Sequence, residues 1–219
     1  MTSTTPRHLR PAAGDLPFDL AAAMRHLRRS DPVLAGLMRR AGPCGLRPKA
    51  TQSLFHALSE SIVYQQLSGK AAATIFGRVV GLYAPKRFPA PADILATPDD
   101  RLRGAGLSAA KTLALKDLAA KTLDGTVPSL ARVRRLEDDE IIERLIQVRG
   151  IGVWTVQMLL MFRLARPDVL PTGDLGVRKG FALTYGLDEQ PTPAELAEHA
   201  ERWRPYRTVA SWYMWRALD

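Results

Sequence analysis

Residues 145–155 read Leu-Ile-Gln-Val-Arg-Gly-Ile-Gly-Val-Trp-Thr, a Gly-x-Gly turn between two stretches with helical periodicity. Gly150 and Gly152 allow the backbone to turn tightly and to point its N–H groups outward at the start of a helix. Such a helix N-terminus suits a phosphate, because unpaired amides and the helix dipole both attract an anion. The stretch therefore predicts a helical hairpin over about residues 139–163 that holds a nucleic-acid backbone.

An aspartate follows the second helix of this hairpin. Asp174 ends a Pro/Gly-containing loop, which we place at residues 166–174, and it is suited to cap the next helix. Each feature also has a purely structural interpretation, since a bare Gly-x-Gly is often a helix corner and aspartate is a favoured N-cap. Taken together, they predict a protein that holds DNA and places one carboxylate beside it.

The predicted fold class is all-α. Most segments show helical periodicity punctuated by Pro and Gly, and none shows a convincing strand alternation. We expect a disordered tail over residues 1–15 and a single all-α unit of two helical lobes over residues 16–219. The length of 219 residues is sufficient for a sizeable core.

Charge and composition limit the partners. The net charge of +9 favours a polyanion, and residues 1–50 contribute nine basic against three acidic side chains. Five arginines of that segment fit either a solvated helix face or phosphate contacts: Arg25, Arg28, Arg29, Arg39 and Arg40.

Metal and membrane chemistry are not indicated. The single cysteine, Cys44, excludes an internal disulfide and a cysteine cluster, and the four histidines lack ligand spacing, so we expect no required cofactor. The apolar runs are too short to span a bilayer, and no signal peptide opens the sequence. We expect no membrane partner and a cytoplasmic protein of bacterial type, located at the nucleoid.

The hairpin and the Pro-Thr-Gly-Asp loop at residues 171–174 resemble the helix-hairpin-helix DNA glycosylases, in which such a loop carries a catalytic aspartate. Within that superfamily the sequence is most similar to the alkylation-repair DNA-3-methyladenine glycosylase II group. The resemblance covers about residues 51–217 and includes residues 62–72, 106–111, 174–180, 203–207 and 212–215. It implies a two-lobed helical glycosylase fold in a short form that lacks the N-terminal β-domain of larger members.

The resemblance implies a monofunctional enzyme that hydrolyses the N-glycosidic bond of alkylated bases, such as 3-methyladenine and 7-methylguanine, and so begins base excision repair. Asp174 would stabilise an oxocarbenium-like sugar and orient or deprotonate water. The positive charge of an alkylated purine already weakens the bond, so little acid catalysis is needed. Trp154 stands where bifunctional relatives carry a lysine, and an indole forms no Schiff base, so no lyase activity is expected.

The family also suggests how the damaged base would be held. Trp154, Met158, Leu175 and Trp215 match positions that line the base pocket, where an aromatic ring would stack on a cationic base. Met158 and Leu175 depart from the tyrosines that larger members often carry, which leaves fewer aromatic walls. Either role, pocket or packed core, is open for the tryptophans.

DNA contacts follow from the same resemblance. Gln66 and Leu67 lie where the wedge that fills the gap of a flipped base is expected, although ordinary helix-end packing would also suit them. Phosphate would be held by backbone amides around Gly150, Gly152 and Thr155, with Ser108 and Lys111 as a weaker second contact. A structural Na⁺ or K⁺ could bind the backbone carbonyls of Val148 and Ile151.

Two other functions are open at this point. The hairpin could serve a non-catalytic DNA-binding module, or the enzyme could act on oxidised or mismatched bases. The absence of a hairpin lysine and of a cysteine cluster argues against most enzymes for oxidised bases. Double-stranded DNA containing damaged bases is the expected partner, and the family suggests a monomer.

Overall fold

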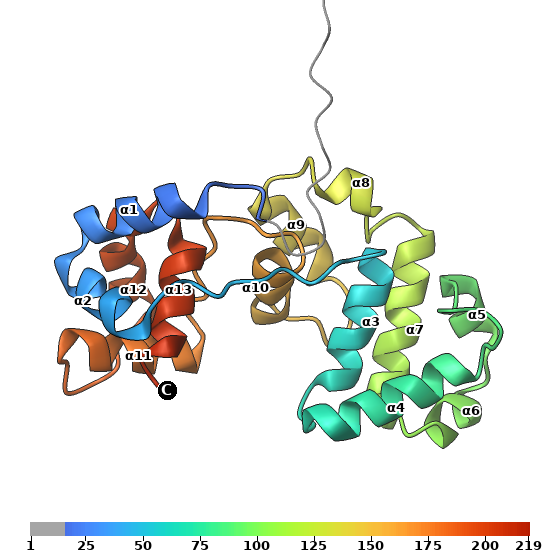
Figure 1. The fold of residues 1–219 in the computed structure, drawn as a ribbon. Coiled ribbons are helices and arrows are strands. Elements are labelled where there is room, and N and C mark those ends of the chain that lie inside the picture. Colours follow the sequence, from blue (N-terminus) through green and yellow to red (C-terminus); the bar gives the residue numbers. More distant parts are fainter. Residues whose placement is uncertain (1–15) are drawn as a thin grey trace, which may run out of the picture. The chain divides into compact units, whose positions relative to one another are not determined.

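The structure, a computed structural model, describes residues 16–219, and every regular element in this range is a helix (Figure 1). The all-α prediction is confirmed, and no strand of a β-domain lies in the described range. The tail predicted at residues 1–15 lies outside the described residues. No helix of the described chain combines the length and apolar character that a membrane crossing requires.

The chain divides into two compact units. One unit is continuous in sequence and spans residues 51–164; the other is discontinuous and joins the residues up to 50 to residues 165–219. We refer to them as the continuous unit and the discontinuous unit. The hairpin belongs to the first and Asp174 to the second.

The continuous unit consists of eight helices among the described elements. They are α3 (Leu54–Tyr64), α4 (Gly69–Gly81), α5 (Pro91–Ala96), α6 (Asp99–Gly104), α7 (Ala109–Leu123), α8 (Leu130–Val133), α9 (Asp138–Leu145) and α10 (Val153–Phe162). Helix α7 packs against α3, α5 and α6, and α10 packs against α3 and α9. The hairpin therefore rests on the same helix, α3, whose C-terminal end carries the predicted wedge.

Serine caps explain where several of these helices begin. The side-chain oxygens of Ser53, Ser68 and Ser108 each accept the backbone N–H three residues later, at 3.0, 3.4 and 3.2 Å. Helix α5 has six residues and a single buried apolar side chain, Ile94, so its sequence shows no helical periodicity.

The discontinuous unit is assembled from both ends of the described chain. It contains α1 (Leu20–Ser30), α2 (Pro32–Ala41), α11 (Leu175–Tyr185), α12 (Pro193–His199), the 3₁₀ helix η1 (Ala200–Trp203) and α13 (Arg207–Arg216). Helices α1 and α2, blue in Figure 1, pack against α13, which is red. Their shared core is built around large buried side chains, chiefly Leu27, Leu34, Met38, Trp203 and Tyr213. The N-terminal helices thus complete the core on which Asp174 depends.

Asp31 joins the two parts of this unit through a buried carboxylate. One oxygen, Oδ1, accepts the N–H of Leu34 at 3.0 Å and caps α2. The other, Oδ2, accepts from Tyr185 Oη at 2.5 Å and Trp203 Nε1 at 2.9 Å, and it lies 3.1 Å from His199 Nε2. Burial alone would raise the pKa of Asp31, but these hydrogen bonds outweigh burial and hold the pKa below its ordinary value.

We expect Asp31→Ala to lower the free energy of unfolding at pH 7 by about 3 kcal/mol or more, since it leaves buried donors without an acceptor. Because the folded-state pKa is lowered, this stabilisation is present above about pH 4 and is lost as the pH falls through the acid range. Urea denaturation of wild type and variant across this range measures both effects.

Asp19 provides the matched control, because it also caps a helix, at Ala22 N, but is exposed. Asp19→Ala should cost only about 1 kcal/mol. Equal losses for the two variants would show that the buried bonds of Asp31 add nothing beyond capping.

Candidate functional site

Asp174 is fixed at the N-terminus of α11 by two hydrogen bonds. Its Oδ1 accepts the N–H of Val177 at 2.8 Å and the indole Nε1–H of Trp215 at 2.9 Å. The aspartate is half-buried, and the helix N-terminus favours a negative charge at this place. The structure therefore brings together two predicted site residues, from α11 and from α13, in direct contact.

Two glycines of α11 make this contact possible. A Cβ atom at Gly176 would lie 2.7 Å from Trp215 Cδ1 and 3.1 Å from Asp174 Oδ1, so a side chain there would displace the pair. A Cβ atom at Gly180 would lie 1.8 Å from the backbone oxygen of Met214. The absence of both side chains lets α11 and α13 cross closely enough for the indole to reach the carboxylate.

The hairpin is formed by α9 and α10 as predicted from the two glycines. Gly150 has a φ of +76°, which a residue with a side chain rarely adopts. Gly152 is the N-cap of α10 and provides no side chain to bind the amides of the first turn. Both glycines are exposed, whereas Thr155 is 8% exposed, so the glycines are the more accessible part of the predicted phosphate site.

The predicted wedge is a tight turn between α3 and α4. Gln66 has a φ of +54°, an unfavourable conformation for a residue with a side chain, and it is exposed. Leu67 is 39% exposed, which is unusual for a leucine at the end of a core helix. Strained backbone of this kind persists where surrounding contacts hold it, and it is enriched at functional sites.

Lys111 provides part of that support. Its ammonium group donates to the carbonyl oxygens of Val63 at 2.7 Å and Gln65 at 2.8 Å, at the C-terminal end of α3. Burial lowers the pKa of Lys111. Two of the three ammonium hydrogens of Lys111 therefore bind the protein backbone, which leaves one for the predicted phosphate contact. Ser108 is likewise engaged as the cap of α7, through Lys111 N.

Gln65 connects the wedge turn to the hairpin. Its side-chain Nε2 donates to the carbonyl oxygen of Gly150 at 2.9 Å. On the other side, the N–H of Arg149 donates to Asp117 Oδ2 of α7 at 2.7 Å. Side chains at the end of α3 and in α7 thus hold the hairpin turn from two directions, and they connect the predicted wedge turn to the predicted phosphate-binding turn.

The four predicted pocket residues form two pairs. Trp154 and Met158 lie one turn apart on α10, and the indole of Trp154 is 51% exposed rather than packed in a core. Leu175 is 55% exposed and directly follows Asp174. Trp215 is half-buried and is hydrogen-bonded to Asp174. One pair belongs to each unit, so a single pocket made of all four residues stays a prediction.

The basic N-terminal segment borders a cavity of its own. A cavity of about 500 Å³ in the discontinuous unit is lined by arginines of α1 and α2 and by an apolar floor, namely Ala21, Met24, Arg25, Arg28, Met38, Arg39, Gly42 and Pro43. None of these is a predicted catalytic or pocket residue. The five arginines singled out from the sequence, Arg25, Arg28, Arg29, Arg39 and Arg40, are all exposed, which fits both interpretations.

No cluster of His, Cys, Asp and Glu among the described residues could hold a metal ion. A monovalent cation at the hairpin would depend on backbone oxygens instead. The carbonyl of Val148 already accepts the N–H of Ile151 at 3.0 Å, and a carbonyl oxygen has a second lone pair that a cation could use. The geometry is compatible with the predicted Na⁺ or K⁺, which stays a prediction.

The sequence of residues 60–205 matches the HhH-GPD superfamily of base excision DNA repair proteins. The chain belongs to this superfamily. It is 40% identical over 162 residues to DNA-3-methyladenine glycosylase 1 of Schizosaccharomyces pombe, an alignment that covers 74% of this chain and 71% of that relative.

Two solved structures agree with this assignment. The Schizosaccharomyces pombe 3-methyladenine DNA glycosylase, solved in complex with abasic DNA, is 36% identical with a TM-score of 0.76, covering 89% of this chain and 95% of that one. The DNA-3-methyladenine glycosidase of Bacillus halodurans is 34% identical with a TM-score of 0.79, covering 89% and 88%.

The sequence interpretation missed Gly176, Gly180 and Gln65 as residues that support the site, and it assigned Lys111 a phosphate contact instead of its role at the end of α3. Gly176 and Gly180 carry a visible signal, a Gly-x-x-x-Gly spacing that places both on one face of α11. Gln65 and Lys111 carry none, because their partners are remote in sequence or are backbone atoms.

We expect Gly180→Ala to destabilise the protein by about 3 kcal/mol or more, because the added methyl group meets the backbone of α13 and cannot be avoided by a rotamer change. Gly77→Ala is the matched control in the interior of α4, where a Cβ atom meets nothing within 4 Å; it should raise stability by up to about 1 kcal/mol. Thermal unfolding compares the two. A tolerated Gly180→Ala would mean that the helix crossing is looser than described.

Proposed function

We propose that this chain is a monofunctional DNA glycosylase that hydrolyses the N-glycosidic bond of alkylated bases in DNA and begins their repair by base excision. The observation that carries the proposal is the half-buried Asp174 carboxylate, held at a helix N-terminus by Trp215. The superfamily to which the chain belongs and the names of its relatives support the same activity.

Asp174 performs the central electrostatic task. As the bond to the base breaks, positive charge develops on the deoxyribose, and a fixed carboxylate stabilises that charge without having to reorganise. The donors from Val177 and Trp215 both bind Oδ1 and so fix the plane of the carboxylate. The same group orients the attacking water and accepts its proton.

Alkylated purines are the substrates that this chemistry favours. A base with an N3 or N7 methyl group already carries positive charge and leaves as a neutral molecule, so a strong general acid is unnecessary. Trp215, beside the carboxylate, offers an electron-rich ring to a cationic base. Trp154 provides no amine, so water is the nucleophile and the product is an abasic site.

DNA is held by the continuous unit in this proposal. The first turn of α10, whose N-cap Gly152 has no side chain, binds a phosphate through backbone amides at Gly152 and beyond, with a monovalent cation on the hairpin carbonyls as an auxiliary group. The exposed Gln66 and Leu67 fill the space left by the extruded base. The enzyme acts as a monomer on chromosomal DNA.

The alternative functions are less well supported. A simple DNA-binding module has no need for a carboxylate aligned by an indole and two glycines. Enzymes for oxidised bases commonly use the lysine that Trp154 replaces. The alkylated-base activity therefore accounts for more of the site than either alternative.

Asp174→Asn should abolish base excision while DNA binding survives, because the amide keeps the shape of the side chain but loses its charge. The measurement is the formation of alkali-labile sites in a duplex carrying one 7-methylguanine, together with affinity for a duplex with an abasic site. Wild-type protein should give no strand cleavage until alkali is added. Excision by the Asn variant at the wild-type rate would remove Asp174 from the mechanism.

Gln66→Gly separates the structural from the functional role of the wedge turn. Glycine adopts a positive φ without strain, so stability should rise by about 0.5–1 kcal/mol, whereas excision from duplex DNA should fall because the wedge side chain is gone. Gln66→Ala serves as the control, since it removes most of the side chain and keeps the strain. If excision is unchanged in both variants, Gln66 is not the wedge.

A further inference from the structure

We propose that Arg207 and Thr208, at the start of α13, are positioning residues for Asp174. They hold the beginning of the loop that leads to the aspartate, and the other end of the same helix holds the aspartate itself. The proposal rests on the proposed function of Asp174 and adds how the carboxylate is held in its position.

Thr208 binds the loop through three hydrogen bonds. Its hydroxyl donates to the carbonyl oxygen of Arg166 at 2.6 Å and accepts the N–H of Val169 at 3.0 Å, and its own N–H donates to the carbonyl oxygen of Pro167 at 3.0 Å. Thr208 is completely buried. The side chain of Thr208 cannot rotate without breaking its hydrogen bonds. Because Thr208 is bonded to three residues of one loop, it fixes the path of that loop.

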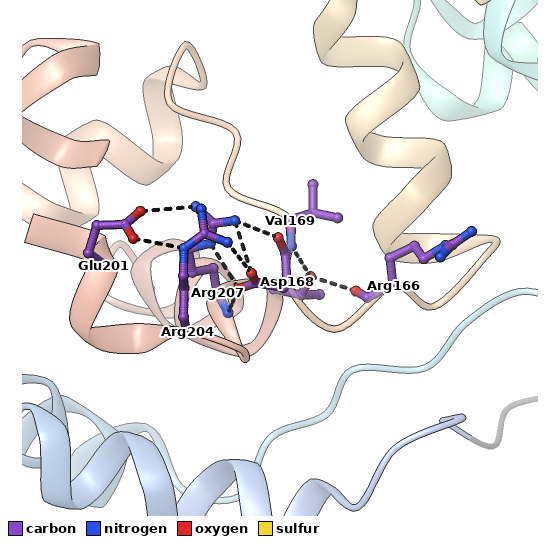
Figure 2. Close-up of polar contacts among 7 residues, drawn as sticks. Arg166, Asp168, Val169, Glu201, Arg204 and Arg207 are labelled. Atoms are coloured by element: carbon purple, nitrogen blue, oxygen red, sulfur yellow. Dashed lines mark hydrogen bonds and ion pairs between the residues drawn. The ribbon is translucent and has the colours of Figure 1, made fainter. Parts of the chain in front are cut away.

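Arg207 binds the residue in the middle of this segment. Its Nε and Nη2 donate to the two carboxylate oxygens of Asp168 at 2.8 and 3.0 Å, in a bidentate pair, and Nη2 also donates to the Asp168 carbonyl oxygen at 3.1 Å. Figure 2 shows the pair together with Arg204, whose Nη1 also donates to Asp168 Oδ2 at 2.7 Å and whose Nε donates to Glu201 at 2.8 Å. The side chain of Arg207 is 15% exposed, whereas that of Arg204 is 48% exposed.

The geometry of α13 connects this clamp to the candidate active site. Thr208 and Trp215 are seven residues apart, so two helical turns bring them to the same face, about 10 Å apart along the axis. Trp215 donates to Asp174 at the far end. The loop is thus attached to one rigid helix both at residues 166–169 and at residue 174.

Fixing both ends restricts where the aspartate can lie. If the first attachment is released, residues 166–169 can shift relative to α13, and Asp174 is held less firmly although Trp215 and the first turn of α11 still bind it. A displacement of about 1 Å in a catalytic group can cost on the order of a hundredfold in rate. The bidentate geometry of Arg207 and Asp168 fixes the orientation of the two groups, which suits the clamp to a positioning role.

Thr208→Val and Thr208→Ser form the matched test. Valine keeps the shape and loses the hydroxyl, and serine keeps the hydroxyl. In single-turnover excision of 7-methylguanine from a duplex, Thr208→Val should be about a hundredfold slower than wild type, with affinity for an abasic-site duplex within twofold, and Thr208→Ser should recover most of the rate. Arg207→Ala should behave as Thr208→Val does.

The indole signals provide a readout that does not depend on activity. With ¹⁵N-labelled tryptophan, the Nε1–H peak of Trp215, identified by Trp215→Phe, should move in Thr208→Val. The peak of Trp203, which donates to Asp31 in the same unit, should stay in place and report an intact core. Movement of both peaks together would show a general loss of structure and overturn the positioning role.

The kinetic result separates this proposal from the proposed function. If Thr208→Val and Arg207→Ala excise within twofold of wild type while Asp174→Asn is inactive, the positioning proposal fails and the glycosylase stands. If wild type excises nothing, the proposed function fails, and the indole peaks still decide whether Thr208 positions Asp174.

Discussion

In the discontinuous unit, the position of the Asp174 carboxylate depends on the hydrogen bond that the Trp215 indole donates to it. It requires α11 and α13 to cross within backbone contact, which only Gly176 and Gly180 permit. It also requires α13 to be held firmly, and the N-terminal helices do so by packing against it around a common core. The charge of one carboxylate is thus positioned by residues drawn from both ends of the described chain.

In the continuous unit, too, residues remote in the sequence hold the candidate site in place, here through long polar side chains. Its candidate functional elements are two turns, the hairpin and the predicted wedge, and polar side chains from elsewhere in the unit hold each of them. Lys111 binds the last carbonyls of α3, and Gln65 ties the same helix end to Gly150. Backbone groups that would otherwise need water are satisfied by long polar side chains, which leaves the turns exposed and still ordered.

Local chemistry explains what the sequence could predict. Glycines at 150 and 152 predict the turn, and Asp174 after a Pro/Gly-containing loop predicts a helix start, because each signal acts within a few residues. The clamp of Asp168 by Arg207 and the support of the wedge by Lys111 join residues about 40 to 50 positions apart, and no periodic pattern marks such partners. The short helix α5 gives no sequence signal for a different reason, because six residues are too few to show helical periodicity.

The central claim is that Asp174 faces the positive charge that develops on the sugar. The most direct measurement compares the affinity of the protein for two duplexes, one with a cationic pyrrolidine in place of the damaged nucleotide and one with a neutral tetrahydrofuran. The account predicts clearly tighter binding of the cationic duplex, and loss of that preference when the charge at residue 174 is removed. Equal affinity of the wild-type protein for both duplexes would contradict it.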